Sequence, residues 1–150
     1  MPVNPRVRYT ATYRIRYNGG MARVPTAAEK PLHWVGSSKK DLLEFPSEVV
    51  DDLGYALSVV QHGGTPPSAK PWKGEGTGVF ELIEEHRSDT FRAVYTVRFE
   101  RAVYVLHCFQ KKSPSGVRTA KQDVSLIHER LRTAQADYEV RYAREEDGDG

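Results

Sequence analysis

The sequence predicts a small α+β domain, in which an antiparallel-dominated sheet is packed by two N-terminal helices and one C-terminal helix. Three observations predict this class: two amphipathic helical patterns follow residue 36, three strand patterns fill the middle, and one more helical pattern lies near the end. The expected order is β-α-α-β-β-β-α. A chain of 150 residues suffices for one domain with a modest core.

The N-terminal half of the domain is expected to begin with a short strand over 33–35. Ser37 suits the N-cap of a first helix, and Pro46 suits the first turn of a second. The apolar residues of the second helix fall on one helical face: Val49, Leu53, Ala56, Leu57 and Val60. Gly63 and Gly64 end this helix, and a loop rich in Pro, Gly and Lys leads to Gly78.

The C-terminal half is expected to hold strands over 79–85, 91–99 and 102–110, the last two joined by a two-residue turn at Glu100-Arg101. A capping box of Thr119 with Gln122 then opens the final helix, which ends near Tyr142. Its apolar face comprises Val124, Ile127, Leu131 and Ala134.

The two ends of the chain differ from the domain between them. Residues 7–17 alternate like a strand, with arginines on one side, and residues 21–31 read as a linker with two prolines. This stretch is either an added edge strand or sequence upstream of a true start at Met21. The expected organisation is an N-terminal extension over 1–31, the domain over 32–142, and an acidic, disordered tail over 143–150.

Composition bounds the class of protein. The chain is 39% hydrophobic and 28% charged, as in ordinary globular proteins, and its net charge of +2 does not by itself indicate a nucleic-acid partner. No apolar run has the length of a membrane span and no signal-peptide core is visible, so a cytoplasmic location is expected. Cys108 is alone, which excludes an intramolecular disulfide.

Strand register sorts the residues of the predicted sheet into two faces. With a turn at Glu100-Arg101, Arg92 lies opposite Phe109, and directly opposed residues share a face. Phe80 and Leu82 join the face that the helices should cover, because the other register would bury glutamates. That covered face also holds Phe91, Ala93, Tyr95, Val97, Phe99, Ala102, Tyr104, Leu106 and Cys108.

The opposite face gathers polar side chains whose chemistry suits cleavage of RNA. It holds Glu81, Arg92, Arg98 and His107, with Lys111 and Lys112 at the rim and Lys70, Trp72 and Lys73 in a bordering loop. Attack by a 2′-hydroxyl needs a base, a proton donor and cations for the growing phosphorane charge. Arginine binds phosphate with a planar fork, lysine adds charge, and tryptophan can stack on a base.

Each of these residues also has a purely structural interpretation. In this interpretation, Arg92 serves only as the partner of Glu81 or Glu85 in a cross-strand ion pair. His107, between Val105 and Phe109, is then a packed histidine. The lysine pair is also typical of a solvated strand end, and Trp72 beside Pro71 is typical of a loop anchor. Their shared face is what favours a site.

Five stretches, taken in order, resemble a family. They are WVGSSKKDLLEFP, GYALSVVQHGG, AKPWKG, VFELIEE and FRAVYTVRFERAVYVLHCFQKKS. From about His33 to Leu131 the chain resembles the HigB-like, phage-associated subfamily of the RelE/ParE toxin superfamily. The resemblance implies a toxin of a type II toxin–antitoxin module, neutralised by an antitoxin that is usually a helix-turn-helix protein. It implies contact with operator DNA only through that antitoxin. Many such toxins cut mRNA in the ribosomal A site, whereas ParE relatives inhibit DNA gyrase.

The resemblance also implies roles for residues. Arg92 matches the arginine taken to hold the scissile phosphate, Lys111 and Lys112 match the basic pair closing the last strand, and Lys70 and Lys73 match positions that contact nucleic acid. RelE has lysines where this chain has Glu81 and Ile83, and it has a tyrosine after the basic pair that is absent here. Glu81 and His107 are therefore assigned as substitutes for the acid–base pair.

The expected function is thus a ribosome-dependent mRNA endonuclease that needs no cofactor. The expected catalytic residues are Arg92, Lys112, His107 and Glu81, and the expected RNA-binding residues are Lys70, Lys73, Trp72, Arg98 and Lys111. No metal is expected, because the sequence shows no clustered carboxylate or His/Cys ligand set. A gyrase inhibitor and a non-catalytic, phage-derived binding module are the alternatives.

Overall fold

The computed structural model describes residues 28–111 and 120–149. The predicted strand over 7–17, the cap at Thr119 and the site residue Lys112 lie outside the described residues. No helix in the described segments is long and apolar enough to cross a membrane.

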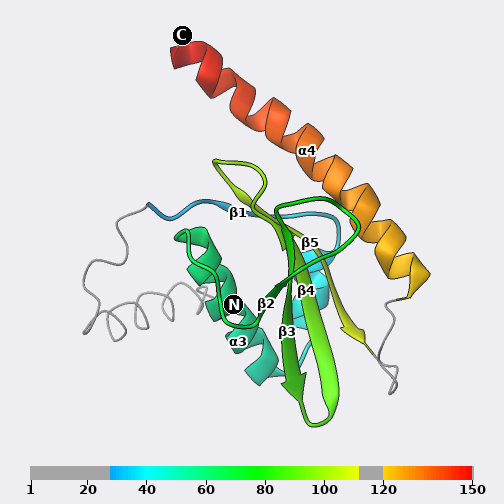
Figure 1. The fold of residues 1–150 in the computed structure, drawn as a ribbon. Helices are drawn as coiled ribbons and strands as arrows, with labels where there is room; N and C mark the ends of the chain where they lie inside the picture. Colours follow the sequence, from blue (N-terminus) through cyan, green and yellow to red (C-terminus); the bar gives the residue numbers. More distant parts are fainter. Residues whose placement is uncertain (1–27, 112–119, 150) are drawn as a thin grey trace, which may run out of the picture.

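The centre of the molecule is a five-stranded mixed sheet with strand order β1-β5-β4-β3-β2 (Figure 1). The strands are β1 (Leu32–Trp34), β2 (Ala69–Pro71), β3 (Val79–His86), β4 (Asp89–Thr96) and β5 (Val103–Lys111). Only β1 and β5 pair in parallel. Four of these strands agree with the sequence prediction to within a few residues. The fifth, β2, lies in the expected loop and was not predicted.

The β3–β4 hairpin places its residues on the predicted faces. Arg87 and Ser88 form the two-residue turn, with φ of 51° and 74°, the positive values that a type I′ turn requires. Phe80 pairs with Tyr95 and Leu82 with Ala93. The placement of Glu81 on the other face from Phe80 and Leu82 is therefore confirmed.

The β4–β5 connection differs from the prediction. Arg92 pairs with Phe109 as expected, but the register shifts between Val94 and Tyr95, so that Tyr95 faces Val105 and Leu106 has no partner on β4. Glu100 and Arg101 form a turn as predicted, with Ala102 N donating to the carbonyl of Phe99 over 3.5 Å. The strands do not extend to this turn, because β4 ends at Thr96 and β5 begins at Val103, so the connection is longer than the predicted two residues. Because of the extra residue in β5, the β5 residues that precede it lie on the face opposite to the one predicted for them.

The helices agree with the sequence pattern apart from their ends. They are α2 (Ser38–Leu43), α3 (Ser47–Gln61) and α4 (Lys121–Asp149). Pro46 occupies the N-cap of α3 and not its first turn, and Gly63, with φ of 90°, follows the helix end as expected. The helix α4 continues to Asp149, so its expected end near Tyr142 is wrong.

Helices cover both faces of the sheet, which corrects the prediction of one covered face. On one face, α2 and α3 pack against residues that include Leu82, Ala93 and Tyr95. On the other, α4 runs obliquely across the sheet, and its Ile127 and Leu131 belong to a second core cluster (Figure 1). Because of the bulge in β5, Tyr104 and Leu106 belong to this second cluster, together with Val94 and Phe109. Both buried clusters are needed because the inner strands carry apolar residues on both sides.

Candidate functional site

The centre of the candidate site is an ion pair between neighbouring strands. Arg92 on β4 and Glu81 on β3 lie on the α4 face, and Arg92 Nη1 donates to Glu81 Oε1 over 2.6 Å. Their side chains are only 15% and 14% exposed. Arg92 Nε is buried and has no hydrogen-bond partner among residues 28–111 and 120–149. Since guanidinium has five N–H donors, the ion pair leaves part of the donor capacity of Arg92 unused.

Lys111 closes the site at the end of β5. It pairs with Thr90, and its side chain shares the face of Arg92. Burial and the neighbouring Arg92 charge lower the pKa of Lys111, while Glu81 opposes this effect. The three groups are thus close enough to interact electrostatically, and the site concentrates positive charge beside one carboxylate.

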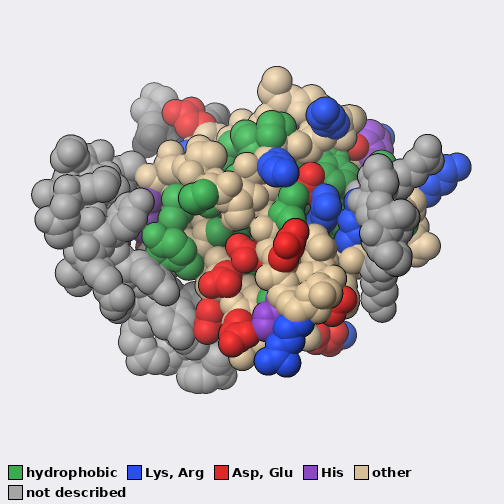
Figure 2. Space-filling view, turned by 60° about the horizontal axis from the view of Figure 1, so that its bottom comes forward, with side chains coloured by type: hydrophobic (Ala, Val, Ile, Leu, Met, Phe, Trp, Pro, Cys, Tyr) green, Lys and Arg blue, Asp and Glu red, His purple; other side chains and the backbone are tan. Residues whose placement is uncertain are grey.

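Two further lysines extend the positive charge toward the sheet edge. Lys70 on β2 is exposed and pairs with Glu81, which places its side chain on the same face. Lys73 is exposed in the following loop. In Figure 2, several Lys and Arg side chains lie in the upper right part of the described surface, while Asp and Glu side chains are most frequent in the lower part, where a further basic group also lies. The upper part thus offers positive charge to an anionic ligand such as RNA.

Arg98 braces the loop that follows β2. Its Nε and Nη2 donate to the carbonyl of Thr77, over 3.1 and 2.8 Å, and Nη2 also donates to the carbonyl of Glu75. The Glu75 carboxylate accepts a contact from His128 Nδ1 on α4 at 3.0 Å. Arg98 therefore fixes the loop that carries Lys73, and its predicted contact with phosphate stays a prediction.

Trp72 lies inside the molecule. It is 7% exposed, belongs to the core cluster beneath α4, and donates its backbone N–H to Val79 over 2.9 Å. A ring buried in this way is not presented to an RNA base. The geometry supports the alternative interpretation of Trp72 as an anchor of the loop.

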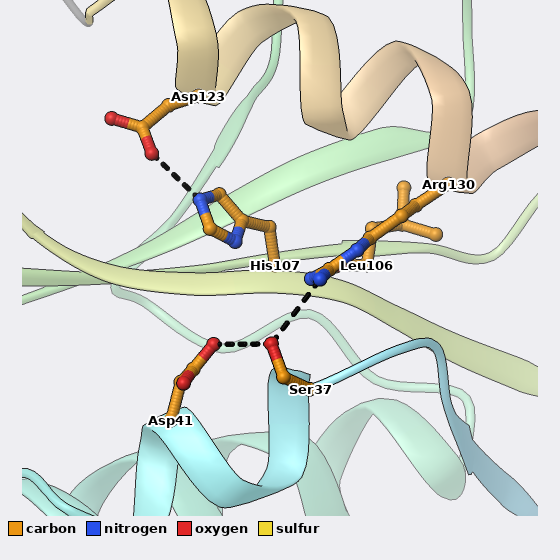
Figure 3. A network of polar contacts seen from close by, with 6 residues as sticks. All are labelled: Ser37, Asp41, Leu106, His107, Asp123 and Arg130. Carbon is orange, nitrogen blue, oxygen red and sulfur yellow. Dashed lines mark hydrogen bonds and ion pairs between the residues drawn. The ribbon is translucent and has the colours of Figure 1, made fainter.

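His107 lies in a separate polar contact at the junction of β5 and α4. Its Nε2 is 2.7 Å from Asp123 Oδ1 (Figure 3). Its ring also stacks on Phe109, with centroids 4.8 Å apart. His107 is 7% exposed, and its cross-strand partner Val94 is fully buried. No contact joins the imidazole to Arg92 or Glu81 in the described residues. The arrangement supports a packed histidine that fastens α4 to the sheet.

The same junction contains residues that the sequence did not point to. Arg130 on α4 donates to the carbonyl of Leu106 over 2.9 Å and to Ser37 Oγ over 3.2 Å, and Ser37 Oγ donates to Asp41 over 2.8 Å (Figure 3). Leu106 is the residue left unpaired by the bulge. Arg130 thus satisfies a carbonyl that the bulge leaves without a partner on β4. The sequence feature that could have identified Asp123 is the presence of an acidic residue in the first turn of the final helix.

The described residues were also compared with the ligand sets that hold metal ions. Among residues 28–111 and 120–149, no group of three or more His, Cys, Asp and Glu side chains is arranged to hold a metal ion. The single cysteine, Cys108, is buried, and burial raises the pKa of its thiol.

Comparison with known proteins gives one family and one solved structure. The family described as "Phage derived protein Gp49-like" matches residues 40–132, which include Glu81, Arg92, His107 and Lys111. The structure is the toxin–antitoxin complex RelBE2 from Mycobacterium tuberculosis, with 18% identity and a TM-score of 0.40 over 54% of this chain and 96% of that chain. No curated protein sequence matches the chain. Because the family match spans more than half of its residues, the chain belongs to the phage-derived Gp49-like family.

Proposed function

We propose that this protein is the HigB-like toxin of a type II toxin–antitoxin module and cleaves ribosome-bound mRNA. The observation that carries the proposal is the partly buried Arg92–Glu81 pair with Lys111 beside it, on a face bordered by Lys70 and Lys73. The sequence resemblance to HigB-like toxins supports the same function. A soluble antitoxin partner, of the helix-turn-helix type, is part of the proposal.

The proposed chemistry begins with exchange of one anion for another. The scissile phosphate takes the place of Glu81 at the Arg92 guanidinium, since phosphate matches the same planar fork. This exchange releases the Glu81 carboxylate beside the bound nucleotide. Glu81 can then accept the proton of the 2′-hydroxyl as that oxygen attacks phosphorus.

The remaining groups stabilise charge and the leaving oxygen. Arg92 stays on the phosphate and stabilises the charge of the phosphorane. Lys111, with its lowered pKa, donates a proton to the 5′ oxygen as the P–O5′ bond breaks, which leaves a 2′,3′-cyclic phosphate. The predicted catalytic role of Lys112 remains part of the proposal, as an additional cation next to Lys111.

The first test is cleavage of ribosome-bound mRNA by the purified protein, with the same mRNA free of ribosomes as the control. We expect cuts only in the ribosome-bound sample, with cyclic phosphate at the new 3′ ends. Gyrase supercoiling is measured in parallel. Intact mRNA together with inhibited supercoiling would replace the proposal by a ParE-like activity, and no effect in either assay would favour a binding module.

A further inference from the structure

A groove lies on the side of the molecule away from the phosphate site. It runs between α3, the segment 65–68 and β3. The helix contributes Asp52, Tyr55, Ala56 and Val59, which share one helical face, and β3 contributes Glu84. Pro66 and Pro67 complete a mostly apolar lining. The groove therefore combines an apolar surface with carboxylates toward the start of α3.

The carboxylates of this groove are poorly neutralised. Burial, followed by Asp51 and Glu48, raises the pKa of Asp52, while His86 opposes this effect, and burial followed by Asp52 raises the pKa of Glu84. His86 is itself engaged by another carboxylate, since its Nδ1 lies 3.3 Å from Glu48 Oε1. Like charges held together in a partly desolvated place favour an incoming cation.

The chain itself contains a segment of complementary charge. Residues 1–27 contain five arginines and no aspartate or glutamate. Since the whole chain has a net charge of +2, residues 28–150 carry −3 once these five charges are removed. Within 7–17, three arginines alternate with tyrosines, Val7 and Ile15. This stretch thus offers both cations for carboxylates and apolar rings for an apolar lining.

The attachment point of this segment lies near the groove. Lys30 N donates to the carbonyl of Gln61 and Gln61 Nε2 donates to the carbonyl of Lys30, each over 2.8 Å. Gln61 ends α3, two residues after Val59 of the groove. From Val59 to Asp52 the helix rises by about 10 Å. The ten residues between 17 and 28 span up to roughly 35 Å, so the reach is sufficient.

We propose that residues 7–17 bind in this groove, with their arginines at Asp52 and Glu84 and their tyrosines on the apolar lining around Val59. The occupant is the chain's own N-terminal segment. A covalent link raises the local concentration of the segment at the groove above that of any free competitor of equal affinity. The proposal is independent of RNA cleavage.

Chymotrypsin digestion of the full-length protein tests the proposal, because Tyr9, Tyr13 and Tyr17 are cleavage sites inside the segment. We compare the wild type with Asp52→Asn/Glu84→Gln on the groove side, and with Arg8→Gln/Arg14→Gln/Arg16→Gln on the segment side. Cleavage at these tyrosines should become about tenfold faster in either variant, since it follows the population of released segment. A protein that carries both sets of substitutions should be cleaved no faster than either variant, as expected for partners in one contact.

The matched control is Glu129→Gln, an exposed carboxylate on α4 over the opposite face of the sheet. It should leave cleavage unchanged, and about 1 M salt should remove the protection in the wild type, because the Debye length is then ~3 Å. Equal rates in the wild type and both variants overturn the proposal. Protection that grows with protein concentration also overturns it, because the segment of a second copy is then the occupant. If chymotrypsin cuts Asp52→Asn/Glu84→Gln within the folded domain, the substitutions have destabilised it. The cleavage rate of the segment-side variant alone then tests the proposal.

Discussion

Two polar pairs on the same face of the sheet have different surroundings. Arg92 and Glu81 come from two strands of one hairpin and lie beside Lys111 at the rim. His107 and Asp123 join β5 to α4, and the imidazole is stacked on Phe109 under the helix. Strand alternation predicted the shared face correctly. It did not predict that a helix covers one pair and leaves the other beside exposed lysines.

The comparison teaches that sharing a face does not ensure access to a ligand. In the proposed mechanism the Arg92–Glu81 pair exchanges its carboxylate for a phosphate, and both of its partners lie on strands of the sheet. The His107–Asp123 contact instead joins a strand to the first turn of α4. We therefore expect substitutions in the first pair to affect chemistry most, and substitutions in the second to affect stability most.

The largest expected effect is the loss of cleavage in Arg92→Ala. Removing a cation that stabilises the transition state should reduce cleavage by a few hundredfold, or about 3 kcal/mol. The free energy of unfolding should fall by about 1–3 kcal/mol, because Glu81 loses its partner in a largely buried place. Rates of mRNA cleavage and thermal melts measure the two effects.

Two controls sharpen this result. Arg92→Met/Glu81→Leu removes both charges, so it should regain stability and remain inactive. Tyr95→Ala, in the core under α3, should instead cost about 3–5 kcal/mol of stability. Its activity per folded molecule should be normal. An Arg92→Ala protein that still cuts at the wild-type rate would remove the proposed site.

The second expected effect concerns His107→Ala. It should lower the free energy of unfolding by about 2 kcal/mol, because Asp123 loses its partner and Phe109 its stacking contact. Cleavage per folded molecule should stay within about twofold of the wild type, and Asp123→Ala should be coupled to it in a double-mutant cycle. A normal melt combined with a hundredfold slower reaction would restore His107 as a catalytic residue.

A third effect is expected in the pH dependence of Lys111. Its pKa is lowered, so Lys111 loses its proton at a lower pH than an ordinary lysine as the pH rises. Cleavage should therefore fall on the alkaline side at a lower pH than an ordinary lysine would give. Lys111→Arg should retain binding and lose roughly 10–100-fold in rate, as expected for loss of a proton donor. An unchanged alkaline limb in Lys111→Arg would assign Lys111 to binding alone.

The smallest effect is expected for the exposed lysines. Lys70→Ala and Lys73→Ala should each weaken ribosome or RNA binding several-fold at low salt and reduce the salt slope by about 1. Lys39→Ala on α2, over the opposite face, is the matched control and should bind normally. If the affinity for RNA were unchanged in both variants, RNA would contact only the rim at Lys111.

The sequence by itself determined much of the hairpin that carries the candidate site. Phe80 and Leu82 alternate with Glu81, and the cost of burying glutamates selected the strand parity that the structure has; the two-residue turn at Arg87 and Ser88 is seen only in the structure. These features are local, because alternation and turn length involve residues close in the chain. The positions of Glu81 and Arg92 on one face could therefore be inferred without any structure.

Tertiary structure alone decided which of the predicted residues are accessible. At the bulge, Arg130 of α4 donates to the carbonyl of Leu106, and β2 forms where three residues of an expected loop pair with β3. The burial of His107 depends on α4 crossing the second face of the sheet. Each of these features needs a partner distant in the chain, and side-chain alternation along one strand contains no information about such partners.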